Sequence, residues 1–295
     1  MNKINIFSAF IMLIILASCG APKQITHYDQ LAMQSADSGH YEQAIQEWNE
    51  YIKTEKAKGI EAKSIAYAEL GKAYFLLEQY EQAEVNFDKA RDHNYGDATM
   101  YVMMTERYKM IDNLSKEITA IEYYQAHFPN DKDTSLMRNR LFETSLESEN
   151  WEQAETIWAQ MDDTSKGEEK YLLVYFKMNK KLEKTKKCDE IAAQLLSING
   201  ENREALDWMA KKYYNRAENR YQNAMATYNK KKTTKTYKAL LKELDKVTAD
   251  FKKSLKYFNP LWKMEDGKKY ATYLANIYAR FDDKKKSQYY KGFIK

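Results

Sequence analysis

Apolar and small residues recur every three or four positions along most of the chain, which is the spacing of the buried face of an α-helix. Residues 67–90 show this pattern most clearly. The positions that carry it are Tyr67, Leu70, Gly71 and Tyr74, then Tyr80, Ala83, Phe87 and Ala90. Gly71 and Ala83 are small where two antiparallel helices would cross closely. The pattern therefore predicts a helical pair whose last positions, Phe87 and Ala90, pack against the next pair.

The same pattern recurs upstream and downstream of this pair. The sequence aromatic-Glu-Gln-Ala appears at residues 41–44, 80–83 and 151–154, which predicts equivalent helix starts. Four pairs are expected within residues 28–161, the third ending at Pro129. The step from Ala44 to Ala83 is 39 residues, longer than a repeat of about 34 residues. We expect residues 53–61 to absorb the difference as a longer connection.

Residues 28–161 resemble tetratricopeptide repeats (TPRs), in which each repeat is a pair of antiparallel helices. The resemblance implies an all-α right-handed superhelix, or solenoid, whose concave face is lined by the first helix of each repeat. Positions counted from the matched residues give these candidates for a partner-binding groove: Asp29, Gln30, Met33, Glu69, Lys72, Glu106, Lys109, Asn139, Arg140 and Glu143. Their mixed charge favours an extended or helical peptide as the bound segment.

The repeat pattern loosens after residue 165, so residues 20–165 are interpreted as repeats one to four and residues 166–295 as a degenerate TPR-like region. Two long helical patterns, at 206–228 and 237–258, flank a polar link at 230–234. They predict a projecting hairpin over 203–258 with arms of about 26 residues, or about 39 Å each. We expect Pro260 to end its second arm, and short capping helices to follow near the C-terminus. Few glycines and prolines, 9 and 3, argue against a sheet with many tight turns.

The N-terminus has the composition of a secretory signal. Lys3 precedes an apolar run from residue 4 to 16, which is too short to span a bilayer as a helix. The following Leu16-Ala17-Ser18-Cys19 is similar to a bacterial lipobox. That resemblance implies a signal peptide over 1–19 and a diacylglycerol and further acyl chains, such as palmitate, on Cys19. An ordinary cleaved signal is the alternative. Gly20 after the cysteine implies outer-membrane sorting, and the lack of acidic residues at positions 21–24 implies a periplasm-facing position.

Charge is divided unequally along the chain. Residues 20–165 hold 14 Lys and Arg against 27 Asp and Glu, and residues 166–295 hold 32 against 16. Three interpretations stay open: attraction between the two ends or between copies, contact of the basic half with an anionic lipid, wall polymer or acidic protein, and plain solubility. Lys230, Lys231 and Lys232 form the basic tip of the predicted hairpin. The signal peptide places the protein away from nucleic acid.

No residue pattern in the sequence indicates catalysis or a cofactor. His27, His40, His93 and His127 lack metal-ligand spacing, and neither a phosphate loop nor a nucleophile elbow is present. If Cys19 is lipidated, Cys188 has no intramolecular disulfide partner. We interpret Cys188 as a packing residue, with a reactive thiol as the alternative.

These observations predict a non-catalytic scaffold for protein partners at the cell envelope, held on the outer membrane by lipid and part of an assembly or secretion complex. Neither a small-molecule substrate, a metal nor a cofactor is expected. The alternative function is a cell-wall or polysaccharide-binding lipoprotein that uses the basic C-terminal half.

Overall fold

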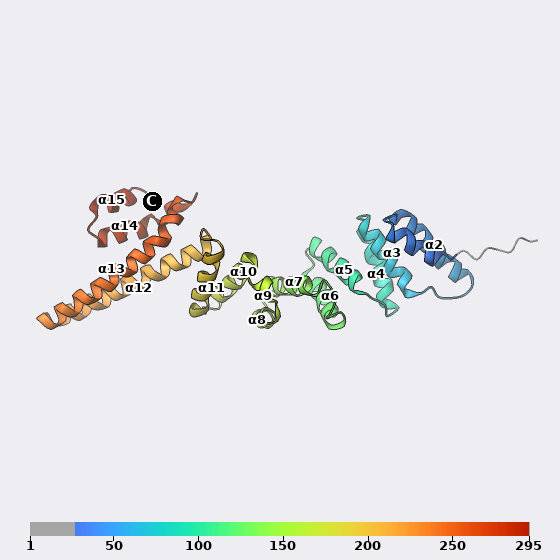
Figure 1. The fold of residues 1–295 in the computed structure, drawn as a ribbon, viewed down its shortest axis with the longest axis horizontal. Helices are drawn as coiled ribbons and strands as arrows, with labels where there is room; N and C mark the ends of the chain where they lie inside the picture. Colours follow the sequence, from blue (N-terminus) through green and yellow to red (C-terminus); the bar gives the residue numbers. More distant parts are fainter. Residues whose placement is uncertain (1–26, 295) are drawn as a thin grey trace, which may run out of the picture. The chain divides into compact units, whose positions relative to one another are not determined.

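The computed structural model describes residues 27–294, and all of the regular elements in this range are helices (Figure 1). The chain divides after Ile111 into two compact units, which are described separately. The predicted signal peptide and Cys19 lie outside the described residues. None of the helices in the described range has both the length and the apolar character needed to cross a membrane.

The first unit contains two antiparallel helical pairs and one further helix. The pairs are α1 (Tyr28–Asp37) with α2 (Tyr41–Ala57) and α3 (Ser64–Leu76) with α4 (Tyr80–Asp92), followed by α5 (Ala98–Met110). Helices α2 and α4 begin at the aromatic residue of the repeated tetrapeptide, and Ala44 and Ala83 are fully buried. The predicted register of these repeats is therefore confirmed.

The extra length of the first repeat lies mainly in a helix, which corrects the expectation of a longer connection. Helix α2 has 17 residues against 13 in α4. The added turn, residues 54–57, follows Tyr51 and Ile52, and Tyr51 packs in the core with Trp48. Burial of these side chains, together with the good helix formers that follow them, extends the helix through residue 57.

The predicted close crossing lies between α3 and α4. A β-carbon built on Gly71 would lie 2.4 Å from the Phe87 ring and 3.2 Å from the carbonyl oxygen of Ala83. Phe87 is itself 1% exposed, so its ring has little room to move away. Glycine is needed here because the helices are too close for any side chain.

The second unit continues the alternation of first and second helices. It holds α6 (Leu114–His127), α7 (Thr134–Glu147), α8 (Trp151–Gln160), the short α9 (Asp163–Lys166), α10 (Glu169–Lys181) and α11 (Thr185–Ile198). Helix α8 begins at Trp151 as predicted, and Ala154 is fully buried. Cys188 is buried in α11 and is free, with its thiol pKa raised by burial. The packing role predicted for Cys188 fits this position.

One turn geometry links the two helices of successive pairs in both units. The residue two before each second helix has a positive φ, between 54° and 76°: Gly39, Glu78, Asp112, Glu149, Glu183 and Asp282. At every one of these positions except Asp112, its N–H donates to the carbonyl three residues back and the next N–H to the carbonyl five back, at 2.8–3.2 Å. This is a Schellman motif. The turn before α11 matches those of the clear repeats, so α10 and α11 form a further pair of the same kind.

The long hairpin is present and is longer than predicted. Helices α12 (Arg203–Lys230) and α13 (Thr234–Lys263) have 28 and 30 residues, which is about 42 and 45 Å at 1.5 Å per residue. Their joined end extends past the C-terminal helices in Figure 1. The Ser254 hydroxyl donates to the Ala210 carbonyl at 2.9 Å, and the Arg216 guanidinium forms a two-pronged ion pair with Asp250.

Pro260 lies inside α13, so the expectation that it ends the arm is wrong. A proline within a helix removes one N–H donor and costs roughly 3 kcal/mol. Phe258 and Leu261 on either side are fully buried, and Trp262 contacts Tyr290 with ring centroids 4.9 Å apart. Packing of these large side chains offsets the local penalty of the proline.

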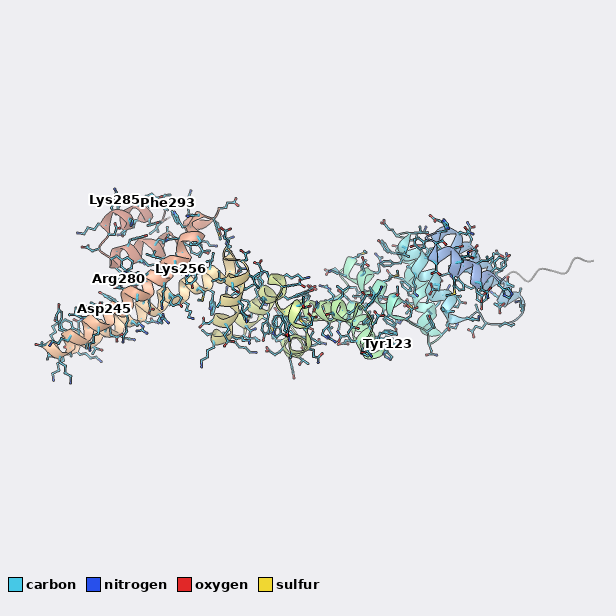
Figure 2. The ribbon with its side chains drawn as sticks, viewed as in Figure 1. Tyr123, Asp245, Lys256, Arg280, Lys285 and Phe293 are labelled. Atoms are coloured by element: carbon cyan, nitrogen blue, oxygen red, sulfur yellow. The ribbon has the colours of Figure 1, made fainter. Side chains whose placement is uncertain are left out.

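Two short helices cover the base of the hairpin, as the predicted capping helices should. They are α14 (Ala271–Arg280) and α15 (Lys284–Lys291), preceded by the 3₁₀ turn Gly267–Tyr270. Leu274 and Ile277 of α14 join the core formed by Phe251 and Phe258. Arg280, labelled in Figure 2, pairs with Glu218 at 2.9 Å and so ties α14 to α12. The domain boundary predicted at residue 165 falls inside this unit. The division into regular repeats before it and degenerate repeats after it stays a prediction.

Candidate partner-binding groove

A groove of about 850 Å³ lies in the second unit, between α7, α10 and the start of α12. Its apolar lining consists of Leu146, Trp151, Val174 and Met178. These residues come from one face of α7, the first residue of α8 and one face of α10. On α10 the groove residues Val174, Lys177, Met178 and Lys181 are spaced three or four apart. They therefore lie along one side of the helix, where Met178 is 1% exposed and also belongs to the core, while Lys177 and Lys181 are exposed.

Charges of opposite sign line the two edges of the groove. Glu143 and Glu147 of α7 lie on one edge, and Lys177, Lys180 and Lys181 of α10 on the other. The Lys181 ammonium lies 2.6 Å from Glu149 and 5.1 Å from the Trp151 ring centroid. Lys180 lies 3.6 Å from Glu204. Lys177 is exposed and has no ion pair among the described residues, so its charge is available to a bound anion.

A second hollow of about 610 Å³ follows α12 and shares Lys180 with the groove. Asn215, Asn219 and Asn223 line it at intervals of four residues, so they lie along one face of the helix. All three are exposed, and their carboxamides make no hydrogen bond to other described residues. A carboxamide both donates and accepts, which matches a peptide group. Trp208 lies at the end of this row nearest the groove.

The predicted groove residues of the first unit lie on α1, α3 and α5. Gln30, Met33, Glu106 and Lys109 are exposed, and Asp29 is half-buried beside Lys63, at 3.4 Å. Exposure of these side chains agrees with a surface role. The structure gives no further sign of a site there.

Lys72 has a structural role within the first unit. Its ammonium lies 2.8 Å from Glu69 and 2.6 Å from Asp97, whose other oxygen accepts the Met100 N–H at the start of α5. Burial alone would lower the pKa of Lys72, but the hydrogen bonds to Asp97 and Glu69 outweigh it and raise that pKa. Lys72 therefore ties α3 to the start of α5, and its charge is already neutralised.

The predicted residues of the second unit, Asn139, Arg140 and Glu143, are all on α7 but differ in environment. Asn139 is buried and donates to the Ser165 hydroxyl at 2.8 Å, contrary to the expected exposure. Glu143 lines the groove. Arg140 lies between α6 and α7, where its guanidinium binds Glu117 through two nitrogens at 2.5 and 3.0 Å.

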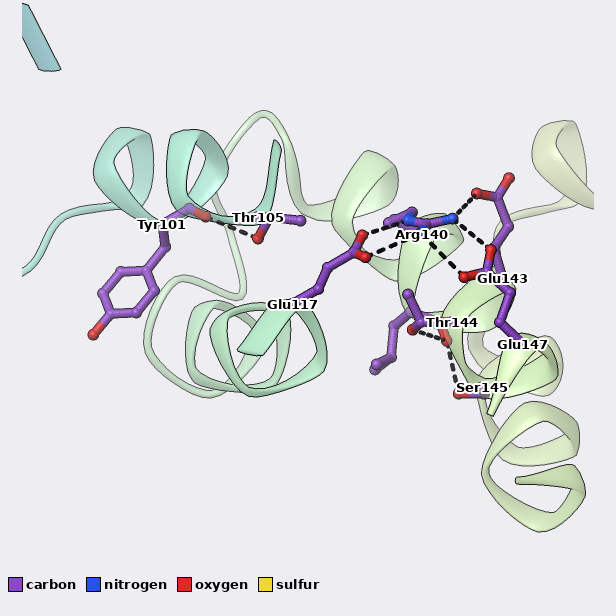
Figure 3. A network of polar contacts seen from close by, with 9 residues as sticks. Tyr101, Thr105, Glu117, Arg140, Glu143, Thr144, Ser145 and Glu147 are labelled. Atoms are coloured by element: carbon purple, nitrogen blue, oxygen red, sulfur yellow. Dashed lines mark hydrogen bonds and ion pairs between the residues drawn. The ribbon is translucent and has the colours of Figure 1, made fainter. Parts of the chain in front are cut away.

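Glu143 and Glu147 complete a network around Arg140, each 3.0 Å from the same guanidinium nitrogen (Figure 3). Burial lowers the pKa of Arg140, but the hydrogen bond to Glu117 and those to the two other carboxylates raise it overall. Arg140 thus holds the acidic edge of the groove in place. Its own charge is neutralised by these carboxylates and is not available to a ligand. Sequence reasoning missed Glu117, which is 1% exposed and belongs to a different helix.

Sequence reasoning also missed Trp151, Val174 and Lys177. Trp151 was predicted only as a helix start, whereas it is half-buried and lines the groove. Val174 and Lys177 lie where the repeat pattern is loose. Their spacing of three residues on α10, on a side of the helix away from Tyr175 and Phe176, is the signal that could have found them. No group of histidines, cysteines or carboxylates within residues 27–294 is arranged to hold a metal ion.

The paired helices, the buried alanines at Ala44, Ala83 and Ala154, and the recurring turn decide the fold type. The described helical pairs have the fold of tetratricopeptide repeats.

Comparison with known proteins finds similar solved structures at low sequence identity. No protein-family model and no curated protein matches the chain. Among solved structures it is similar to YrrB, a TPR protein with an unusual peptide-binding site, at 16% identity and a TM-score of 0.49, over 63% of this chain and 90% of that one. The C-terminal part of a TPR protein from Cytophaga hutchinsonii has 14% identity and a TM-score of 0.47, over 90% and 93%. A TPR protein from Parabacteroides merdae has 11% identity and a TM-score of 0.45, over 90% and 96%.

Proposed function

We propose that the chain is a non-catalytic scaffold that holds a segment of a partner protein in the groove between α7, α10 and α12. The observation that carries the proposal is an apolar floor of Leu146, Val174, Met178 and Trp151 between edges of opposite charge. Apolar pockets supply binding energy, and a few charged groups at their rim fix the orientation of the ligand. The arrangement suits a peptide with an apolar anchor beside an acidic residue that reaches Lys177.

The row of asparagines on α12 would extend this contact along the peptide backbone. Residues four apart on a helix are about 6 Å apart along its axis, and alternate residues of an extended chain are about 6.6–6.8 Å apart. Asn215, Asn219 and Asn223 can therefore each meet an alternate peptide group. Such contacts are independent of sequence, whereas the apolar floor and Lys177 select the side chains.

Selection of peptides from a random library on the immobilised protein tests this function. Selected peptides should combine an apolar anchor with an acidic residue and should bind the wild type. Binding should fall at least tenfold in Val174→Glu and in Lys177→Glu, since each change costs more than about 1.4 kcal/mol when a charge is buried or reversed at a binding site.

Val85→Glu is the matched control. Val85 is 54% exposed on α4 of the first unit, so this variant introduces the same charge at a residue that does not line the groove. Unfolding midpoints measured for all the variants separate lost binding from lost folding. Peptides that bind Val174→Glu and the wild type equally would refute the groove as the site.

We further propose that Cys19 carries a lipid anchor on the outer membrane, facing the periplasm, where the scaffold serves an envelope assembly or secretion complex. The support is the lipobox-like sequence at residues 16–19 and Gly20 after it. Cys19→Ser should move the protein from the membrane fraction to the soluble fraction on cell fractionation. Metabolic labelling with palmitate should disappear in the same variant, and retention of the label would contradict the anchor.

A further inference from the structure

The hairpin tip, defined as residues 228–242, carries six lysines and no acidic residue. Lys230, Lys231, Lys232, Lys235, Lys238 and Lys242 are all exposed. None of the six forms an ion pair with another residue of the described chain. Glu243, the next acidic residue, is 2.6 Å from Lys246 and 3.7 Å from Arg220. The positive charge of the hairpin tip is therefore uncompensated, unlike that of the arginines closer to the base of α12.

Exposed apolar side chains accompany these lysines. Tyr237 and Leu241 are 48% and 44% exposed and are four residues apart on α13, so they share one face. The Tyr237 ring also contacts Tyr228 of α12, with ring centroids 5.9 Å apart. Solvation of the helix end does not account for this exposed apolar face, because polar side chains would serve that purpose.

The connection at the hairpin tip is short and capped. Only residues 231–233 separate the two helices, and Thr233 caps α13 in a capping box with Thr236. The Thr236 hydroxyl also donates to the Lys231 carbonyl at 2.5 Å. Little conformational entropy would be lost when such a preorganised end meets a surface.

We propose that the hairpin tip docks on a bilayer rich in anionic phospholipid. The lysines meet lipid phosphates while Tyr237 and Leu241 enter the interface between headgroups and acyl chains. An acidic polymer would also attract the lysines but would leave Leu241 without a partner, whereas a bilayer engages both kinds of side chain. The inference is independent of the groove and of the ligand that the groove holds.

Vesicle co-sedimentation tests the proposal with the full chain carrying Cys19→Ser, so that no lipid anchor contributes. Vesicles of phosphatidylcholine alone are compared with an equal mixture of phosphatidylcholine and phosphatidylglycerol. The protein should pellet with the mixture only, and less so as salt is raised. Replacing Lys230, Lys231 and Lys232 together by glutamine should lower the partition coefficient roughly a hundredfold, because each lysine near an anionic surface contributes about fivefold.

A matched triple variant separates the hairpin tip from net charge. Lys284, Lys285 and Lys291 of α15 are exposed and have no ion pairs among the described residues, and their replacement by glutamine removes the same charge. This variant should leave the partition coefficient nearly unchanged. Tyr237→Gln with Leu241→Gln should abolish the binding that remains at high salt.

Three results would overturn the proposal. The first is an equal loss of binding in the two triple variants, and the second is no preference for the anionic mixture. The third is sedimentation with purified peptidoglycan but not with vesicles, which would identify a wall polymer as the partner of the hairpin tip. Far-UV circular dichroism of each variant, all of whose changes lie at exposed positions, confirms that the helices are intact.

Discussion

Arg140→Met removes the cation that joins α6 to α7. The variant therefore measures how much the buried carboxylate of Glu117 destabilises the protein when its charge is not neutralised. Glu117 is 1% exposed and receives two hydrogen bonds from Arg140. Loss of one partner of a buried ion pair costs about 3–5 kcal/mol, because the other charge is left without compensation. The contacts with the more exposed Glu143 and Glu147 add little, since surface pairs contribute about 0.2–1 kcal/mol. We expect a loss of about 3–5 kcal/mol in the free energy of unfolding of the second unit.

Two further variants show whether the buried charge is the cause. Glu117→Leu combined with Arg140→Met replaces both partners by apolar side chains, and its free energy of unfolding should return close to that of the wild type. Arg140→Lys keeps the charge but loses the planar two-pronged geometry, so its stability should lie between the wild type and Arg140→Met.

Urea unfolding followed by circular dichroism measures these differences. Hydrogen exchange of α6 and α7 should accompany it, because a chain of two units need not unfold in one transition. A loss below about 1 kcal/mol in Arg140→Met would refute the reasoning, as would a double variant no more stable than the single one.

Three other changes test the close crossing, a helix cap and the recurring turn. Gly71→Ala should lower the thermal midpoint, because contact with the Phe87 ring outweighs a gain of about 1 kcal/mol in helix propensity, and a higher midpoint would contradict the crossing. A hydrogen bond from Ser135 lowers the pKa of Asp162 from 3.8 to about 2, so the wild type should lose this stabilisation as pH falls from 3.8 towards 2. Asp162→Asn should show a smaller pH dependence of its thermal midpoint in that window. Identical pH profiles for the variant and the wild type would contradict a stabilising role of the Asp162 carboxylate. Glu183→Gly should raise the free energy of unfolding by up to about 1 kcal/mol and so raise the urea midpoint, because Glu183 has a φ of 55°, and a lower midpoint would argue against strain at that turn.

The helices of the clear repeats could be predicted because local pattern and packing agree there. Tyr41, Tyr80 and Trp151 each begin a helix, and the alanine three residues later is buried in every case. Local rules failed where packing between distant residues outweighed them. Pro260 stays within α13 because its neighbours are buried in the core of the second unit.

The site could be predicted only in part because it depends on contacts between helices. Counting within one repeat identified Glu143 but could not show that Arg140 faces Glu117 of the preceding helix, or that Lys72 is held by Asp97. The groove itself is lined by α10, where the repeat spacing is loose. Its residues became apparent once the fold placed α10 beside α7 and the start of α12.

Cys188 makes transient separation of α10 and α11 measurable in the otherwise native protein. In Cys19→Ser it is the sole thiol of the chain, and because it is fully buried a disulfide reagent can reach it only when α11 separates from the helices packed against it, α10 among them. The labelling rate then reports how often this pair opens beside the groove. A peptide that binds only the closed arrangement should slow the labelling in proportion to its occupancy, so the reaction doubles as a ligand assay that needs no tag.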